Sequence, residues 1–282
     1  MAIQTIAVIG AGTMGRGIAQ IASTAGVNVI MIDVNDAALQ AGMTAIANNL
    51  DRLVKKDKLT TDQKQTALGR IRTTLQYPDI AAAEIIIEAA TEHYPVKAAI
   101  LKQVEAVRKT DSIVASNTSS VSITKLAAGL ARPDQFIGLH FFNPVPVMAL
   151  IEIVRGLQTS DATHDIAEAF ALQLGKSPIT VKNAPGFVVN RLLLPMINEA
   201  FFVLGESDAT ATEIDQGMKL GCNHPMGPLA LADLIGLDVL LSVMDIIHTE
   251  IGDPKYRPCP LLRELVEAGY LGRKTGRGVF RY

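Results

Sequence analysis

Cysteine is scarce in this sequence, and neither sign of charge is in excess. The 282 residues include two cysteines, Cys222 and Cys259, whose spacing matches neither a metal site nor a disulfide framework, which suits a reducing compartment. The formal net charge is −2, with acids and bases mixed along the chain. No general attraction to nucleic acid or to an anionic membrane is therefore expected, and any anion site must be local.

Long apolar runs, internal repeats and low-complexity stretches are also missing. No run reaches the length that spans a membrane, and the opening MAIQTIAVIG lacks the basic segment of a secretory signal. These absences predict a cytoplasmic protein without a membrane or nucleic-acid partner. The hydrophobic fraction of 49% is ample for a sizeable core, and the length indicates one large or two moderate domains.

Short β-rich runs alternate with helical patterns through the first part of the chain. Such alternation predicts an α/β fold, with a parallel sheet covered by helices. The runs are residues 5–10, 27–33, 85–88, 113–116, 136–140, 151–154 and 179–181.

A longer insertion separates the second run from the third. Apolar residues recur there at helical spacing, which predicts a helix of about five turns: Leu39, Met43, Ile46, Leu50 and Leu53. Thr60 and Thr61 are suited to cap a second, shorter helix that ends near Leu68. The insertion is therefore predicted to form a helical hairpin that projects from the sheet.

The pattern changes at Asn183-Ala184-Pro185-Gly186. Beyond this point it is helical only, with apolar stripes in residues 187–204, 229–235 and 237–247. We therefore predict a Rossmann-type domain over residues 1–183 and an all-helical domain over residues 184–282.

The segment IAVIGAGTMGRGIAQ places a Gly-x-Gly-x-x-Gly motif between a strand and a helix. Gly10 permits a tight turn, Gly12 lets a pyrophosphate approach the backbone, and Gly15 lets the helix pack on the strand. The phosphates would lie against the helix N-terminus. The motif, with the intervening Thr13 and Met14, predicts a dinucleotide site.

Asp33 ends the second predicted strand, near the spacing at which a carboxylate binds the ribose hydroxyls of NAD. It would repel a 2′-phosphate, and no arginine follows it in Val34-Asn35-Asp36. NAD is thus predicted over NADP. The alternative is that Asp33 only starts the next turn.

Several segments together resemble the short-chain 3-hydroxyacyl-CoA dehydrogenases, most closely the bacterial 3-hydroxybutyryl-CoA dehydrogenases. Besides the glycine motif these are Ser-Asn-Thr-Ser-Ser at 116–120, Gly-Leu-His-Phe-Phe-Asn-Pro at 138–144, Pro-Gly-Phe-Val-Val-Asn-Arg at 185–191 and Gly-Tyr-Leu-Gly-Arg-Lys-Thr-Gly at 269–276. The resemblance covers essentially the whole chain. It implies NAD-dependent interconversion of 3-hydroxyacyl-CoA and 3-oxoacyl-CoA, with a C-terminal domain that binds substrate and makes a homodimer.

The resemblance makes His140 the catalytic acid/base and Glu152 its partner. Oxidation of a secondary alcohol needs a base for the hydroxyl proton, and imidazole titrates closest to neutral pH. A carboxylate fixes the ring's tautomer through its other nitrogen. His140 closes one predicted strand and Glu152 lies in the next, so a strand pair would bring them together. The alternative is a core histidine bonded to backbone.

The resemblance assigns Ser119 and Asn190 as substrate-binding residues of the catalytic set and places Asn117 against the coenzyme. Ser-Asn-Thr-Ser-Ser on its own is more often a turn and helix cap. Asn190 interrupts an apolar stripe that includes Phe187, Leu194, Ile197 and Phe201, so the amide would either face the substrate or bond across the core.

The predicted hairpin carries Arg52, Lys55, Lys56 and Lys58. The first three, at spacings of three and four, would share a helix face and bind a phosphate of CoA, although solvated lysines explain the same pattern. The resemblance gives further coenzyme contacts at Glu92, Lys97, Asn143 and Lys274, where a surface helix explains Lys97 equally well.

Other functions remain open. The histidines have no metal-ligand spacing, so no metal is predicted. A non-catalytic NAD-binding protein could keep this fold, and dehydrogenases of free 3-hydroxy acids open with a similar glycine motif but use a lysine as acid/base. The His140 and Glu152 arrangement with the basic hairpin favours the CoA-dependent enzyme.

Overall fold

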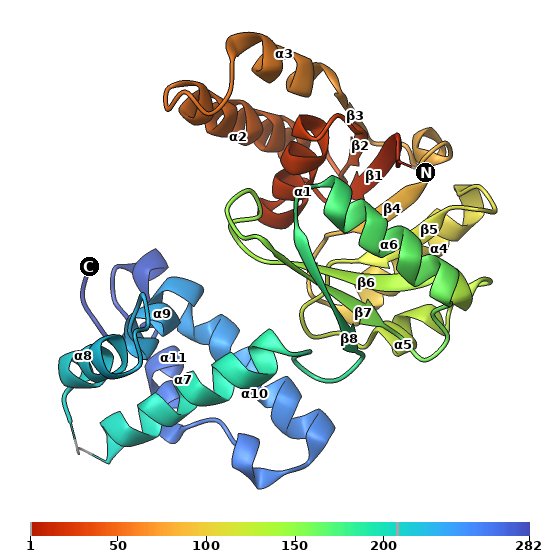
Figure 1. Ribbon diagram of the computed structural model, residues 1–282. Helices are drawn as coiled ribbons and strands as arrows, with labels where there is room; N and C mark the ends of the chain where they lie inside the picture. The colour runs from red at the N-terminus through yellow and green to blue at the C-terminus, as the bar shows by residue number, and fades with distance from the viewer. Residues whose placement is uncertain (1, 207–208) are drawn as a thin grey trace. The chain divides into compact units, whose positions relative to one another are not determined.

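The structure, a computed structural model, describes residues 2–206 and 209–282. The chain forms two compact units, Met1–Ala184 and Pro185–Tyr282. The first is a sheet flanked by helices, and the second is helical (Figure 1).

The first unit is built on an eight-stranded sheet with the order β3-β2-β1-β4-β5-β6-β7-β8. The strands are β1 (Thr5–Ile9), β2 (Asn28–Ile32), β3 (Ile71–Thr74), β4 (Ile85–Glu88), β5 (Ile113–Ser116), β6 (Phe136–Phe141), β7 (Leu150–Arg155) and β8 (Ser177–Lys182). The chain moves outward from β1 to β3, then returns to β4 on the other side of β1. Such a reversal opens a crevice at the carboxyl ends of β1 and β4, where open α/β sheets bind ligands.

The central strands are buried on both faces. Every residue of β4 and β5 is buried, and so are all but the first residue of β1 and β2. Continuous apolar runs of this kind are typical of parallel strands covered by helices on either side. The covering helices are α1 (Thr13–Thr24), α4 (Tyr94–Val107), α5 (Ile123–Ala127) and α6 (Asp161–Gln173), with short 3-10 helices η1 (Tyr77–Ile80) and η2 (Pro133–Gln135).

The predicted helical hairpin is confirmed. It consists of α2 (Asp36–Val54) and α3 (Thr61–Gly69), which lie beside α1 near the β3 edge of the sheet (Figure 1). The Asn35 side chain accepts a hydrogen bond from the Ala38 N–H at the start of α2. Thr60 and Gln63 form a reciprocal capping box at the start of α3, which satisfies two backbone donors there.

The second unit packs helices around its own apolar core, which includes Phe201, Leu229, Leu240 and Ile247. The helices are α7 (Val189–Gly205), α8 (Ala211–Gly221), α9 (Pro228–Ile235), α10 (Leu237–Ile251) and α11 (Pro260–Glu267), with 3-10 helices η3 (Pro254–Tyr256) and η4 (Arg273–Thr275). None of the helices over residues 2–206 and 209–282 is both long and apolar enough to cross a membrane.

The structure corrects three sequence predictions about these elements. Strand β3, in the insertion, was not predicted because its sequence IRTT lacks an apolar pattern. The β6–β7 pair is antiparallel in an otherwise parallel sheet. Helix α7 begins at Val189 rather than at 187, because Gly186 and Phe187 have φ of 75° and 50°, which a right-handed helix does not accept.

Candidate active site

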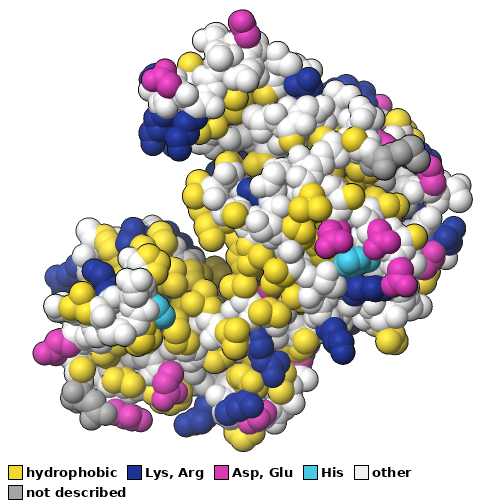
Figure 2. Space-filling view, in the orientation of Figure 1, with side chains coloured by type: hydrophobic (Ala, Val, Ile, Leu, Met, Phe, Trp, Pro, Cys, Tyr) yellow, Lys and Arg dark blue, Asp and Glu magenta, His cyan; other side chains and the backbone are white. Residues whose placement is uncertain are grey.

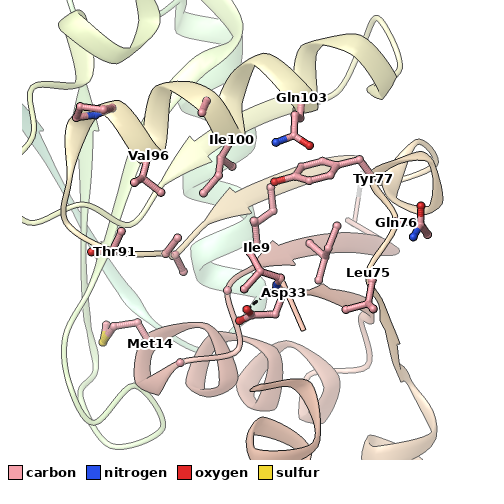
Figure 3. A pocket seen from close by; sticks show the side chains of 18 of the residues that line it. Ile9, Met14, Asp33, Leu75, Gln76, Tyr77, Thr91, Val96, Ile100 and Gln103 are labelled. Carbon is pink, nitrogen blue, oxygen red and sulfur yellow. Dashed lines mark hydrogen bonds between the residues drawn. The ribbon is translucent and has the colours of Figure 1, made fainter. Parts of the chain in front are cut away.

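A cavity of about 1160 Å³ opens beside the carboxyl ends of β1, β2 and β4. Its lining includes Gly10, Gly12, Thr13 and Met14 of the predicted dinucleotide loop, but not Ala11 or Gly15. Asp33 also lines it (Figure 3). Sequence reasoning missed the opposite wall, which comes from the segment after β3 and from α4: Leu75, Gln76, Tyr77, Val96, Ile100 and Gln103. Burial raises the pKa of the Tyr77 hydroxyl, and the nearby carboxylates of Glu88 and Asp33 raise it further.

The three glycines of the loop each meet a different requirement. Gly10 has a φ of 106°, and a Cβ there would lie 2.7 Å from the carbonyl oxygen of Ala89. A Cβ on Gly15 would lie 1.8 Å from the carbonyl oxygen of Gly10, so the helix contacts the strand directly. A Cβ on Gly12 would meet nothing within 4 Å, and no side chain caps α1. The N-terminus of α1 therefore presents its N–H groups to the cavity, as a diphosphate requires.

Asp33 is held by the backbone and also faces the cavity. Its Oδ2 accepts a hydrogen bond from the Ala11 N–H at 2.7 Å, and its Oδ1 accepts one from the Val34 N–H at 2.6 Å. Each carboxylate oxygen can accept more than one hydrogen bond, so both can still receive a ribose hydroxyl. Turn formation and ribose binding are thus compatible at this residue. The residues present fit NAD.

His140 and Glu152 lie directly opposite each other on the antiparallel strands β6 and β7. The Nδ1 of His140 lies 2.7 Å from Oε2 of Glu152, and the two residues are 5% and 0% exposed. The Phe142 ring packs against the imidazole at 4.5 Å between centroids. The predicted strand pair therefore brings the two side chains together, and the ring is held by both a carboxylate and an aromatic neighbour.

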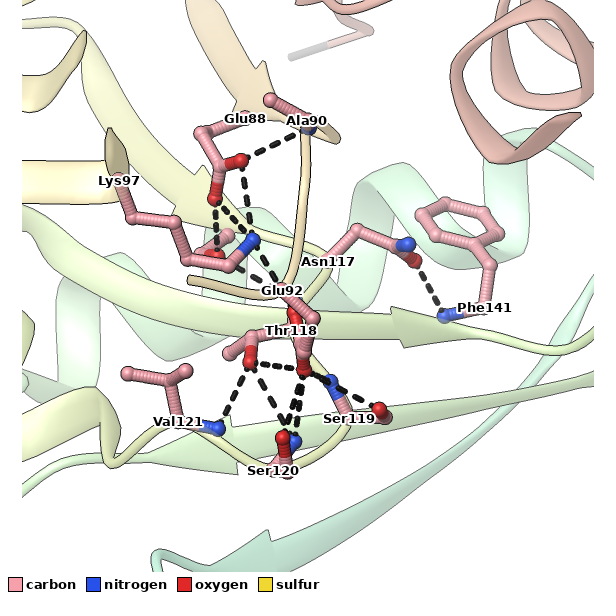
Figure 4. A network of polar contacts seen from close by, with 11 residues as sticks. Glu88, Ala90, Glu92, Lys97, Asn117, Thr118, Ser119, Ser120, Val121 and Phe141 are labelled. Atoms are coloured by element: carbon pink, nitrogen blue, oxygen red, sulfur yellow. Dashed lines mark hydrogen bonds and ion pairs between the residues drawn. The ribbon is translucent and has the colours of Figure 1, made fainter. Parts of the chain in front are cut away.

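The Glu92 carboxylate organises the loop that carries Ser119 (Figure 4). Its Oε1 accepts hydrogen bonds from the backbone N–H groups of Ser119 and Ser120, at 2.6 and 2.9 Å, and from the Thr118 hydroxyl at 2.6 Å. The Ser119 hydroxyl also points to this oxygen, at 3.1 Å. Burial opposes ionisation of Glu92, but the charge of Lys97 and these hydrogen bonds outweigh it and lower its pKa.

Lys97 is not a surface residue, which corrects the alternative reading of its helix. It is 1% exposed, and its Nζ contacts both oxygens of Glu88 at 3.0 and 2.8 Å and Oε2 of Glu92 at 3.2 Å. Glu88 was not predicted as part of the site. A charged residue closing the apolar strand IIIE was the available signal, since a buried carboxylate needs a partner.

Asn117 links the Ser119 loop to the strand of His140. Its side-chain oxygen accepts a hydrogen bond from the Phe141 N–H at 3.0 Å (Figure 4). Beyond β6, Asn143 is exposed and joined to Pro144 by a cis peptide bond. The Lys176 ammonium, whose pKa burial lowers, donates to the carbonyls of Val145 and Met148 at 2.7 Å each and braces this turn.

The basic residues of the hairpin are exposed around the end of α2, where Figure 2 shows Lys and Arg side chains gathered. Only Arg52 belongs to the helix, since α2 ends at Val54, Lys55 is its C-cap and Lys56 follows. The predicted shared helix face extends to Lys55, whose N–H still donates to the Asp51 carbonyl in right-handed helical geometry. It is wrong at Lys56, because the chain tightens into a turn with Asp57 at a φ of 54°. Over the described ranges, none of these four cations forms an ion pair.

The second unit carries two of the predicted site residues. Asn190 is the second residue of α7 and is partly exposed, whereas Asn198, two turns later, is the amide that bonds across the core to the backbone of Arg257 and Cys259. The Lys274 ammonium lies 2.6 and 2.7 Å from the carboxylate oxygens of Asp238. In the part of the chain that the structure describes, no group of His, Cys, Asp and Glu is arranged to hold a metal ion.

The lowered pKa of Glu92 predicts a pH-dependent stability. A depressed carboxyl pKa contributes stability that is present above the unfolded-state value and is lost as pH falls through the folded-state value. We expect Glu92→Gln to lower the melting temperature at pH 7. The difference from the parent should shrink below about pH 4, where free glutamate protonates. Thermal unfolding of both proteins between pH 3 and 8 measures this, and a constant difference would contradict it.

The sheet reverses its strand order beside a glycine loop, and a carboxylate lies at the end of its second strand. Together with the buried histidine and glutamate pair, these features define the class of NAD-dependent oxidoreductases. The chain belongs to the 3-hydroxyacyl-CoA dehydrogenase family. The pattern of that family's NAD binding domain matches residues 5–184, and the pattern of its C-terminal domain matches residues 186–282.

Individual relatives agree with this assignment over nearly their full length. The chain is 50% identical to 3-hydroxybutyryl-CoA dehydrogenase of Bradyrhizobium diazoefficiens over 99% of this chain and 96% of the relative. It is 49% identical to a probable 3-hydroxybutyryl-CoA dehydrogenase of Bacillus subtilis, over 100% and 98%. Among solved structures, (S)-3-hydroxybutyryl-CoA dehydrogenase PaaH1 of Ralstonia eutropha matches with a TM-score of 0.98 and 63% identity, over 100% and 99% of the two chains.

Proposed function

We propose that the chain interconverts (S)-3-hydroxybutyryl-CoA and acetoacetyl-CoA, with His140 as acid/base and Glu152 as its partner. The observation that carries the proposal is the 2.7 Å contact between these two buried side chains in a fold that binds NAD. The relatives named above act on the four-carbon substrate according to their names, which supports the chain length proposed here.

In the oxidation direction, His140 accepts the proton of the substrate's 3-hydroxyl through Nε2. NAD, which the glycine loop and Asp33 would hold, would supply the hydride acceptor for the carbon that bears the 3-hydroxyl, and NADH the hydride donor in the reverse direction. Glu152 accepts the Nδ1–H of the ring, which fixes the tautomer with Nε2 as the basic nitrogen and stabilises the imidazolium that forms. In the reduction direction the same imidazolium donates its Nε2 proton to the developing alkoxide.

Ser119 and Asn190 are proposed to donate hydrogen bonds to the substrate's 3-oxygen. A donor aimed at the oxygen where charge develops stabilises the transition state. The Ser119 hydroxyl points to Glu92 in this structure, so it must rotate toward the substrate. The Ser119 N–H stays bonded to Glu92 during that rotation and keeps the residue in place. The role of Asn190 is proposed from the family resemblance.

Further coenzyme contacts, outside the lining of the cavity, are also proposed from the family resemblance. They are Glu92, Lys97, Asn117, Asn143 and Lys274. The position of Asn117 supports its part, because its side chain bridges the carboxyl end of β5 to the strand of His140. Lys97 is already bonded to two carboxylates, so its effect on the coenzyme would be exerted through the loop that these carboxylates hold.

The exposed cations Arg52, Lys55, Lys56 and Lys58 are proposed to bind the phosphates of CoA. Four positive charges that form no ion pair with any residue the structure describes make an attractive site for phosphate. Lys55→Ala with Lys56→Ala should raise the KM for acetoacetyl-CoA about three- to tenfold, with little change in that for NADH. Initial rates with either substrate varied test this, and Lys102→Ala with Lys109→Ala is the control. Equal increases in both constants would contradict a CoA-specific contact.

We also propose that the second unit binds substrate and forms a homodimer, and that the protein acts in the cytoplasm. Large apolar side chains that are half or more exposed on its helices support a protein partner for this unit: Leu192, Leu220 and Leu234. Sedimentation of the purified chain measures the dimer directly.

The experiment that tests the activity is a spectrophotometric assay of NADH consumption. We expect oxidation of NADH with acetoacetyl-CoA, and much slower rates with free acetoacetate or with NADPH. A rate with acetoacetate equal to that with the thioester would favour a dehydrogenase of free 3-hydroxy acids. Binding of NADH without turnover of either compound would favour a non-catalytic homologue.

A further inference from the structure

Glu88 lies at the end of β4, fully buried, with each of its carboxylate oxygens accepting two hydrogen bonds (Figure 4). Oε1 accepts from the Ala90 N–H at 2.8 Å and from the Lys97 ammonium at 3.0 Å. Oε2 accepts from the same ammonium at 2.8 Å and from the Ser116 hydroxyl at 2.6 Å. A buried carboxylate that accepts from all these donors fixes the position of each of them.

The Lys97 ammonium, which Glu88 holds in place, in turn contacts the Glu92 carboxylate. Its three protons are directed to Glu88 and to Oε2 of Glu92, and no water shell competes because the residue is 1% exposed. Glu92 in turn uses Oε1 for the backbone of Ser119 and Ser120. A continuous chain of carboxylate, ammonium and carboxylate thus runs from the centre of the sheet to the loop of Ser119.

We propose that Glu88 is a positioning residue for the reaction, which acts through Lys97 and Glu92 to hold Ser119 where its hydroxyl meets the substrate's 3-oxygen. This inference rests on the role proposed above for Ser119. Glu88 itself touches neither the dinucleotide cavity nor the substrate: it is not among the residues that line the cavity, and its oxygens are occupied by Ala90, Lys97 and Ser116.

The test is Glu88→Gln in the full chain. The amide keeps the size of the side chain but removes its charge and turns one acceptor into a donor that faces the Lys97 ammonium. The ammonium then depends on Glu92 alone, and Glu92 shifts toward it and away from the loop. Loss of a single donor to a developing oxyanion reduces kcat by about 10²- to 10³-fold, so a displaced one should reduce it by about ten- to hundredfold. Because Glu92 and Lys97 are also proposed coenzyme contacts, the dissociation constant for NADH is measured by fluorescence, and kcat is compared at saturating NADH.

Glu84→Gln is the matched control. Glu84 precedes the same strand and also accepts backbone hydrogen bonds, from Gln4 and Thr5, at the opposite end of the sheet. The Glu84→Gln substitution removes an equal charge just before β4 without touching the Ser119 loop, so kcat should remain that of the parent. The kcat of each variant is calculated per NADH-binding site, so that unfolded protein is not counted. Equal losses of kcat in Glu88→Gln and Glu84→Gln would overturn the proposal in favour of a general effect on folding.

A double-mutant cycle with Ser119→Ala separates this proposal from the function on which it rests. If Glu88 acts through Ser119, Glu88→Gln should reduce kcat of the Ser119→Ala enzyme by less than about twofold. A full additional reduction would overturn the proposal while leaving Ser119 as a substrate donor. A Ser119→Ala enzyme with parental kcat would instead contradict the proposed function, and the positioning proposal with it.

A milder pair of variants covers the case in which Glu88→Gln does not fold. Ser116→Ala removes one hydrogen bond to Glu88, at the carboxyl end of β5, together with a longer one of 3.3 Å that the hydroxyl accepts from the Thr118 N–H. It should reduce kcat by about two- to fivefold. Ser112→Ala removes an equally buried hydroxyl that donates to the Ala83 carbonyl, just before the amino end of the same strand, and should leave kcat unchanged. No difference in kcat between these two variants would contradict the proposal.

Discussion

Replacement of His140 by alanine should reduce kcat for acetoacetyl-CoA reduction by about 10²- to 10⁴-fold, the usual range for loss of a general acid/base. The cavity proposed for the dinucleotide does not include His140 in its lining, so the dissociation constant for NADH should change less than about threefold. Steady-state kinetics and a fluorescence titration with NADH measure the two quantities separately.

Alanine also removes the hydrogen bond between His140 and the buried Glu152 carboxylate, and loss of such a buried hydrogen bond destabilises a protein by about 1–3 kcal/mol. His140→Asn separates this effect from the chemistry. Its amide can donate toward Glu152 but cannot take up a proton at neutral pH. We expect His140→Asn to be as inactive as His140→Ala and closer to the parent in melting temperature.

His164→Asn is the matched control for this series. His164 also contacts a carboxylate, that of Asp165 at 3.2 Å, but it lies on α6 and bonds to Thr180. Parental activity is expected for this variant. Turnover by His140→Asn at the parental rate would remove His140 from the mechanism.

The fold could be predicted from the sequence where a local pattern alone decides the structure of a segment. The strands of the central sheet are continuous apolar runs, and the Thr60 capping box marks its helix from sequence alone. Strand β3 could not be predicted in the same way, because Arg72 and Thr73 give it no apolar pattern and it is held by pairing with β2. The direction of β7 depends on its partner β6, which the sequence of β7 does not encode.

The site was predictable as far as its residues carry their own signal. The spacing between His140 and Glu152 allowed a strand pair, and the observed register places them face to face. The sequence around Lys97 was equally consistent with an exposed lysine, since a lysine on a helix usually lies in solvent. Its burial becomes intelligible only once β4 and α4 bring Glu88 and Glu92 to its ammonium. Such partners are distant enough in the chain that only the folded structure brings them together.

Replacement of Glu152 by glutamine tests the other half of the acid/base pair. The amide oxygen can still accept the Nδ1–H of His140, so the ring keeps its place between β7 and Phe142. What the variant loses is the negative charge that stabilises the imidazolium. We expect kcat to fall by about 10²- to 10³-fold, since a neutral partner no longer supports the charged form of the ring.

The same loss of charge should change the pH dependence of ketone reduction. Reduction requires imidazolium, so activity declines as pH rises and the ring loses its proton. Without the Glu152 charge the imidazolium is less stable, so the midpoint of that decline in activity should lie at lower pH than in the parent. Glu152→Asp keeps the charge but shortens the side chain. Its pH midpoint should therefore stay close to that of the parent, whereas its kcat should fall. A pH profile of Glu152→Gln identical to that of the parent would show that the carboxylate acts on the fold and not on the proton.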